Sequence, residues 1–276
     1  MSEAFKVACI QNCAANDMAA NLATVECLLR SAHAQGAALA CLPEFFCNLE
    51  PADGNYYDNG FEADAHPALA AMGALARELG LWLLLGSIPV KAGDRKVHNR
   101  SIVLDPQGAI VATYNKIHLF DVAIKDGQSY KESNGVAAGG EAVIATLPWG
   151  GLGLTICYDV RFPHLYRRLA QHGASFLSIP AAFTAKTGAA HWHTLVRARA
   201  IETGSYVFAP GQCGTRPWGR ATYGHSLIVD PWGTVLADGG EEEGVIVAEV
   251  DPARVTEVRR MIPSLTHDRD IAGPLP

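Results

Sequence analysis

The sequence is poor in charge and has no block of basic residues. Charged residues make up 18% of the 276-residue chain, against 49% hydrophobic residues, and the formal net charge is −6. Recognition of nucleic acid or of an anionic membrane surface needs clustered lysine and arginine side chains, which these scattered residues do not supply. We therefore expect neither as a partner. The composition is instead typical of a packed globular protein.

Long apolar runs and paired cysteines are also missing. The longest strongly apolar stretch, residues 81–90, is too short to cross a bilayer. The N-terminus shows no basic segment followed by an apolar one, so we expect no secretion signal. The seven cysteines are an odd number without paired spacing, which favours reduced thiols and a cytoplasmic protein.

The remaining pattern predicts one α/β domain that covers residues 1–276. Apolar runs and turn residues indicate alternating strands and helices in each half of the chain. In the first half we expect strands at 6–10, 38–42 and 81–87, helices at 17–35 and 67–79, and a hairpin of 99–104 with 109–114. In the second half we expect strands at 151–156, 175–179 and 206–210, helices at 163–172 and 191–203, and a final hairpin.

The two hairpins share a turn, Asp105-Pro-Gln-Gly108 in the first and Asp230-Pro-Trp-Gly233 in the second. Such turns are common enough that the match could be chance, but it also suggests two similar halves. If each half is a sheet with helices on one face only, the bare faces must bury each other. The predicted architecture is therefore a four-layer αββα sandwich of two mixed sheets.

Cys157 lies where the apolar run 151–156 changes to residues 158–163. This position predicts a sharp turn between a buried strand and a helix that Pro163 can start, which would lift the side chain clear of the sheet. Nearby helix-terminal N–H groups would favour the thiolate. Because free cysteine is among the most buried residue types, Cys157 taken alone is more often a core residue than a nucleophile.

Two further segments carry reactive side chains that we expect to lie near Cys157. Glu44, in Leu42-Pro-Glu-Phe-Phe46, follows a buried strand as Cys157 does, and open α/β sheets carry their sites at the carboxyl ends of strands. Lys116 ends the first hairpin, in Tyr114-Asn-Lys-Ile-His-Leu-Phe120. Taken singly, Glu44 is more readily a loop cap and Lys116 a solvated hairpin end than a catalytic group.

Together these segments resemble those of the nitrilase, or carbon–nitrogen hydrolase, superfamily, which carries a Glu-Lys-Cys triad in this order. Further similar segments lie at 188–192 and 223–226, so the resemblance covers nearly the whole chain. It is strongest to the branch of deaminated glutathione amidase and ω-amidase, on the segments 197–203 and 223–233. That branch usually has Glu after Arg-Phe-Pro, where this chain has His164, which leaves a helix-start or subunit contact there in doubt.

The resemblance implies a role for each residue of the triad. Cys157 would attack the substrate and form a thioester, and Glu44 would move protons among the thiol, the leaving nitrogen and water. Lys116 would stabilise the oxyanion together with a backbone N–H near Tyr158. Glu132 resembles the second active-site glutamate of the superfamily, which would orient Lys116 and hold substrate, although a solvated loop position is almost as consistent with its sequence.

We expect from this a hydrolase that cleaves a non-peptide C–N bond, foremost a primary amide of a short acidic or α-keto acid such as deaminated glutathione, with release of ammonia. A nitrilase or a carbamoyl amidohydrolase on the same scaffold remains an alternative, as does a non-catalytic binding protein. Arg216 and Arg220 are candidate binders of a substrate carboxylate, because a guanidinium matches its geometry. The resemblance also implies a homodimer or a larger homo-oligomer.

We expect no metal or other cofactor. His191 and His193 are two residues apart on the same predicted helix and therefore point to different sides, which disfavours a zinc pair. Asp159 and Arg161 are expected to fix the turn after Cys157 through a local ion pair.

Overall fold

The computed structural model describes residues 3–49, 56–58, 60–124, 128–216 and 219–273, and two six-stranded sheets form its centre. In the first sheet, three parallel strands lie between antiparallel neighbours. The order across this sheet is β14 (Gly244–Val250), β1 (Phe5–Gln11), β2 (Leu39–Cys41), β3 (Trp82–Lys91), β4 (Val97–Leu104) and β5 (Ile110–Asn115).

The second sheet has the same plan. Its parallel strands β9, β10 and β11 are again flanked by antiparallel ones. The order is β13 (Val235–Asp238), β12 (Leu227–Val229), β11 (Tyr206–Ala209), β10 (Ala174–Ser178), β9 (Gly150–Leu154) and β8 (Val143–Leu147).

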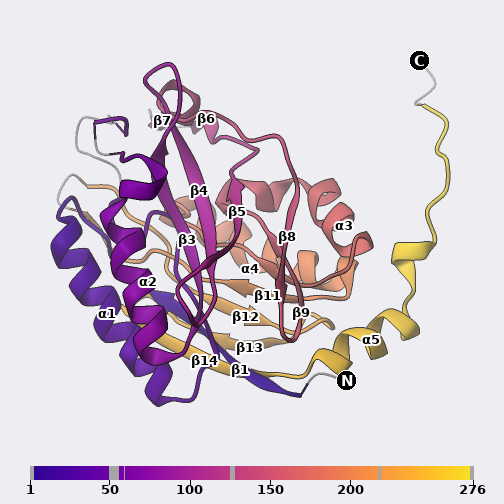
Figure 1. The fold of residues 1–276 in the computed structure, drawn as a ribbon. Coiled ribbons are helices and arrows are strands. Elements are labelled where there is room, and N and C mark those ends of the chain that lie inside the picture. The colour runs from indigo at the N-terminus through magenta and orange to yellow at the C-terminus, as the bar shows by residue number, and fades with distance from the viewer. Residues whose placement is uncertain (1–2, 50–55, 59, 125–127, 217–218, 274–276) are drawn as a thin grey trace.

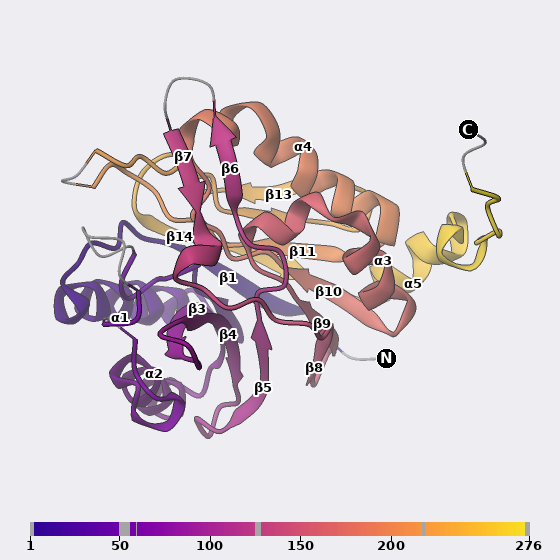
Figure 2. The same ribbon diagram turned by 90° about the horizontal axis from the view of Figure 1, so that it is seen from above.

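Helices cover the outer face of each sheet. Figures 1 and 2 show α1 (Met18–Ala34) and α2 (Pro67–Leu79) on one side of the molecule and α3 (Pro163–Gln171) and α4 (Ala185–Thr203) on the other. The helix α5 (Pro252–Met261) follows β14 near the C-terminus. In the described part of the chain, no helix is long and apolar enough to cross a membrane. The αββα sandwich predicted from the sequence is confirmed.

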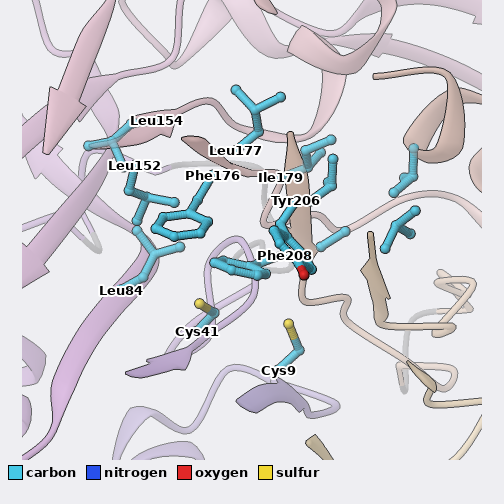
Figure 3. Close-up of a cluster of buried hydrophobic side chains, with 14 of the residues drawn as sticks. Cys9, Cys41, Leu84, Leu152, Leu154, Phe176, Leu177, Ile179, Tyr206 and Phe208 are labelled. Carbon is cyan, nitrogen blue, oxygen red and sulfur yellow. The ribbon is translucent and has the colours of Figure 1, made fainter. Parts of the chain in front are cut away.

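The alternation of strand side chains explains the layers. In β1 and β2, Val7, Cys9 and Cys41 belong to the core between the sheets, whereas Ala8 and Ile10 pack with the apolar faces of α1 and α2. Figure 3 shows the inter-sheet core, where side chains of both sheets meet. The central strand β2 is apolar on both faces because it is covered on both.

The two hairpins close in the same way. The N–H of Gly108 donates to the carbonyl of Asp105 at 2.8 Å, and the N–H of Gly233 donates to that of Asp230 at 2.9 Å. Both glycines have positive φ, 71° and 89°, a conformation that glycine adopts without the steric cost of a Cβ. The match between the two turns in the sequence is therefore a match in structure.

Several elements differ from the expectation. Helix α4 begins at Ala185 rather than His191, because the Thr184 side chain caps it by accepting from the N–H of Thr187. The segment before Glu132, for which the sequence also allows a solvated loop, contains the hairpin of β6 (Asp121–Ile124) with β7 (Gln128–Lys131), although residues 125–127 lie outside the described ones. The last strand, β14, returns to pair with β1, so the C-terminal part of the chain completes the sheet of the first half.

Candidate active site

The predicted sharp turn at Cys157 is present and carries backbone strain. Cys157 has φ 47°, in the left-handed region that costs a non-glycine residue free energy. A short 3₁₀ helix, Cys157–Arg161, separates β9 from α3, which Pro163 starts as expected. The N–H of Cys157 donates to the carbonyl of Pro180 at 2.9 Å, which ties the turn to the segment after β10.

Asp159 fixes this turn, but not through Arg161. Its buried carboxylate accepts from the N–H of Ile156 at 2.8 Å and from the hydroxyl of Tyr114 at 2.7 Å, and it pairs with Nδ1 of His118 at 2.7 Å. The expected ion pair with Arg161 is wrong, because Asp159 is turned inward while the Arg161 guanidinium lies over the Tyr158 ring. Asp159 therefore links the Cys157 turn to the end of β5.

Glu44 is buried, and three donors hold its carboxylate. Its Oε1 accepts from Nζ of Lys116 at 2.9 Å and from Nδ2 of Asn99 at 2.9 Å, and its Oε2 accepts from the N–H of Ala182 at 2.9 Å. The thiol of Cys157 lines the same cavity as Glu44, and the charge of Glu44 acts on it. A carboxylate next to a thiol is the arrangement that general-base activation requires.

Lys116 lies between two carboxylates. Its Nζ contacts Oε1 of Glu44 at 2.9 Å and the two carboxylate oxygens of Glu132 at 3.0 and 2.9 Å. Glu132 begins the 3₁₀ turn after β7, and its Oε2 accepts from the N–H of Phe120 at 2.6 Å. The structure places Glu132 next to Lys116 and not in the solvated loop position that its sequence also allows.

The charges of the cluster follow from these contacts. Burial alone would raise the pKa of Glu44, but the charge of Lys116 and hydrogen bonds from Lys116 and Asn99 hold it below its ordinary value. Burial alone would lower the pKa of Lys116, but the charges of Glu132 and Glu44 raise it well above. Both groups are therefore ionised at neutral pH.

The thiol of Cys157 differs from the expectation. Burial raises its pKa well above the ordinary value, and the charge of Glu44 raises it further, whereas Lys116 only partly offsets these effects. This direction favours a neutral thiol next to a carboxylate over a preformed thiolate.

A cavity of about 620 Å³ opens over the cluster. Glu44, Lys116, Glu132 and Cys157 all line it, and so does the predicted Tyr158. Its wall also includes side chains that the sequence analysis did not single out, namely Phe45, Leu49, Tyr56, Phe120, Tyr130, Lys131, Asn134, Ala182, Phe183, Thr184 and Thr187. The space is of the size that small-molecule sites usually have.

The two arginines that are candidate binders of a substrate carboxylate have different locations. Arg220 lines the cavity, with its guanidinium 5.5 Å from the centre of the Tyr130 ring. Arg216 is only 2% exposed and is not among the described residues that line the cavity. Its guanidinium donates to the carbonyl of Ala14 at 3.1 Å and to that of Cys213 at 2.7 Å, so it fastens the loop after β11 to the loop after β1.

A comparison with known proteins decides the family. The model of the carbon-nitrogen hydrolase family matches residues 6–260. The chain belongs to the carbon–nitrogen hydrolase family. It is 42% identical over 269 residues to deaminated glutathione amidase of Synechocystis sp., which covers 95% of this chain and 97% of the relative. It is 42% identical over 278 residues to the human protein of the same name, with 98% and 84% coverage.

Solved structures agree with this assignment. Nit3 of Saccharomyces cerevisiae, a member of branch 10 of the nitrilase superfamily, superposes with a TM-score of 0.85 at 30% identity, over 95% of this chain and 96% of Nit3. The resemblance predicted from the sequence is confirmed. The protein is therefore an enzyme, a carbon–nitrogen hydrolase.

The histidines of this hydrolase take different partners. His191 Nδ1 lies 3.3 Å from the Arg161 guanidinium, whereas His193 Nε2 lies 2.9 Å from Asp238, which also contacts Nδ1 of His225 at 2.9 Å. Of the described residues, only His193, His225 and Asp238 bring three potential metal-ligand atoms within 4.8 Å of one another. Because both histidines share hydrogen bonds with Asp238, hydrogen bonding already accounts for this arrangement.

Sequence reasoning missed two donors to Glu44. The N–H of Ala182 is a backbone group and leaves no signal in the sequence. Asn99 does leave one, because asparagine is depleted in strands and here lies inside β4.

Proposed function

We propose that this enzyme is an amidase that hydrolyses a primary amide of a short acidic or α-keto acid and releases ammonia through a thioester on Cys157. One observation carries the proposal. Glu44 is hydrogen-bonded to Lys116, and both line one cavity with Cys157, whose thiol feels the charges of both. A base, a nucleophile and a cation at one site are what acyl transfer from a poor electrophile requires.

In the first half-reaction, the sulfur of Cys157 attacks the amide carbon while Glu44 takes the thiol proton. The carbonyl oxygen becomes an oxyanion next to the ammonium of Lys116 and the backbone N–H of Tyr158, which lies in the first turn of a 3₁₀ helix, where N–H groups lack partners within the helix. Glu44 then gives the proton to the nitrogen, the C–N bond breaks and ammonia leaves. The acyl group remains as a thioester.

The second half-reaction uses the same groups to hydrolyse the thioester, with water in place of the thiol as the attacking group. Glu44 takes a proton from water as its oxygen attacks the thioester carbon, and Lys116 again stabilises the oxyanion. The C–S bond breaks, the proton returns to the sulfur through Glu44, and the carboxylic acid product leaves. Glu132 holds Lys116 in place through both halves, supported by its contacts with the Lys116 ammonium.

The substrate class rests on two observations. The relatives at 42% identity are named deaminated glutathione amidase. The cavity wall also carries Arg220 and Lys131, whose positive charges suit a substrate with a carboxylate beyond the reacting amide.

The test compares kcat/KM for ammonia release from deaminated glutathione, a simple α-keto acid amide and the matching nitriles. We expect the amides to be preferred, because donors set for a planar carboxamide pair badly with a linear nitrile and each unpaired buried donor costs about 1 to 3 kcal/mol. The matched control is Cys157→Ala, which should fold normally and release no ammonia. If nitriles were turned over as efficiently as the amides, the assignment as an amidase would be wrong. If the Cys157→Ala variant were active, the thioester mechanism would be wrong.

A further inference from the structure

Asn99 contacts three of the residues in the proposed mechanism, and this inference rests on that mechanism. Its Nδ2 donates to Oε1 of Glu44 at 2.9 Å and to Oε1 of Glu132 at 3.3 Å. Its backbone carbonyl accepts from the N–H of Lys116 at 3.0 Å. The residue is fully buried in β4.

We propose that Asn99 is a positioning residue, which fixes the two active-site carboxylates around Lys116 and keeps Glu44 as the proton acceptor for Cys157. It does not touch the reacting atoms, and it acts through Glu44.

The net charge of the buried cluster of Glu44, Glu132 and Lys116 explains why the neighbouring side chain is a neutral amide. Glu44 and Glu132 bring two negative charges, and Lys116 brings one positive charge, so the buried site keeps an excess negative charge. A second cation would balance that charge, but it would also compete with Lys116 for Glu44. The amide of Asn99 offers two N–H donors and no charge, so it stabilises both carboxylates and leaves Lys116 as the cation.

The orientation of the amide supports this role. The Oδ1 of Asn99 is buried and has no hydrogen-bond partner among the described residues, a state that costs free energy. Turning the amide over would remove both donations and place Oδ1 against the oxygens of Glu44 and Glu132. The observed orientation thus leaves one acceptor unsatisfied and satisfies two carboxylates. An apolar residue of similar size would fill the same space without an unsatisfied acceptor, so packing does not explain the asparagine.

The proposal makes a statement about pH. Among the described residues, the charged and titratable groups next to Glu44 are Lys116, which favours its ionised form, the thiol of Cys157, and Glu132, which shares the Lys116 ammonium with it. Asn99 also favours the ionised form, so loss of its N–H groups raises the pKa of Glu44. Because the base must be deprotonated to accept the thiol proton, the acid limb of kcat/KM then moves to higher pH.

The experiment measures kcat/KM for ammonia release against pH in the parent enzyme and in Asn99→Leu. We expect the acid limb of Asn99→Leu to lie about 1 to 2 pH units higher, the scale of one hydrogen bond to a charged group. The matched control is Asn21→Leu on α1, since Nδ2 of Asn21 also donates twice, but to the neutral carbonyls of Ala15 and Cys47 at 2.8 Å each. The Asn21→Leu variant should be less stable than the parent enzyme, but the acid limb of its kcat/KM should lie at the same pH.

A second variant covers the case in which Asn99→Leu does not fold. In Asn99→Ser the hydroxyl can donate to one carboxylate, so a smaller shift in the same direction is expected. An unshifted limb in a folded Asn99 variant would overturn the proposal, and so would an equal shift in Asn21→Leu. If Cys157→Ala in the same series remains active, the proposed function fails instead, so the two failures are distinguishable.

Discussion

Lys116 is the only cation in the described Glu44–Lys116–Glu132 cluster, so we expect its removal to affect stability and catalysis in separable ways. In Lys116→Met the carboxylates of Glu44 and Glu132, with side-chain exposures of 5% and 10%, lose the ammonium that lies 2.9 Å from each. Removing one partner of a buried ion pair costs about 3 to 5 kcal/mol. We expect a loss of that size in the free energy of unfolding at pH 8, measured by chemical denaturation.

The pH dependence of this loss has a definite sign. Without Lys116, burial and mutual repulsion raise the pKa of Glu44, whose pKa is lowered in the parent enzyme. The parent enzyme gains stability from the ionised Glu44–Lys116 pair above the unfolded pKa of the carboxyl, and it loses that gain as pH falls through the lowered value. The difference between parent and Lys116→Met should therefore shrink as the pH is lowered.

A double variant separates the two roles of Lys116. Lys116→Met/Glu132→Gln removes one of the stranded carboxylates, so we expect part of the lost stability to return. Ammonia release should stay at least about 10²-fold below the parent in both variants, since the oxyanion has lost its donor. Activity near the parent level in either variant, or a stability of Lys116→Met equal to the parent's, would refute the reasoning.

Two further predictions concern the cavity and the stability of α2. Arg220→Met should raise KM for acidic amides while leaving that for neutral amides unchanged; equal effects on both would mean that Arg220 does not meet a substrate carboxylate. Burial lowers the pKa of His66 to about 4, and its Nδ1 caps α2 by accepting from the N–H of Ala68. In the unfolded chain this histidine takes up a proton at its ordinary pKa of 6.5, whereas in the folded protein it stays neutral down to about pH 4. The free energy of unfolding therefore decreases as pH falls from about 6.5 to 4. His66→Asn, which keeps a capping oxygen and does not titrate, should flatten that part of the stability curve, and an unchanged slope would contradict this role.

Much of the fold could be predicted because its signals are local. Pro67 and Gly80 bound α2, and the Asp-Pro-x-Gly turns fix both hairpins, since these residues limit backbone angles without help from distant contacts. The start of α4 was predicted too late, because its first turn is fixed by the Thr184 cap and by Gly188. A Cβ on Gly188 would lie 2.3 Å from the Tyr223 side chain.

The sequence by itself singled out the residues that we propose as reactive. Glu44, Lys116 and Cys157 stand in motifs whose residue types suit the proposed chemistry, so they are visible without coordinates. Only the tertiary structure decided their state. Whether Cys157 rests as a thiol depends on burial and on the distance to Glu44, and whether Arg216 or Arg220 meets the cavity depends on which of them is needed to join two loops. These are properties of groups brought together from distant parts of the chain, and electrostatic interactions depend on distance and burial rather than on order in the sequence.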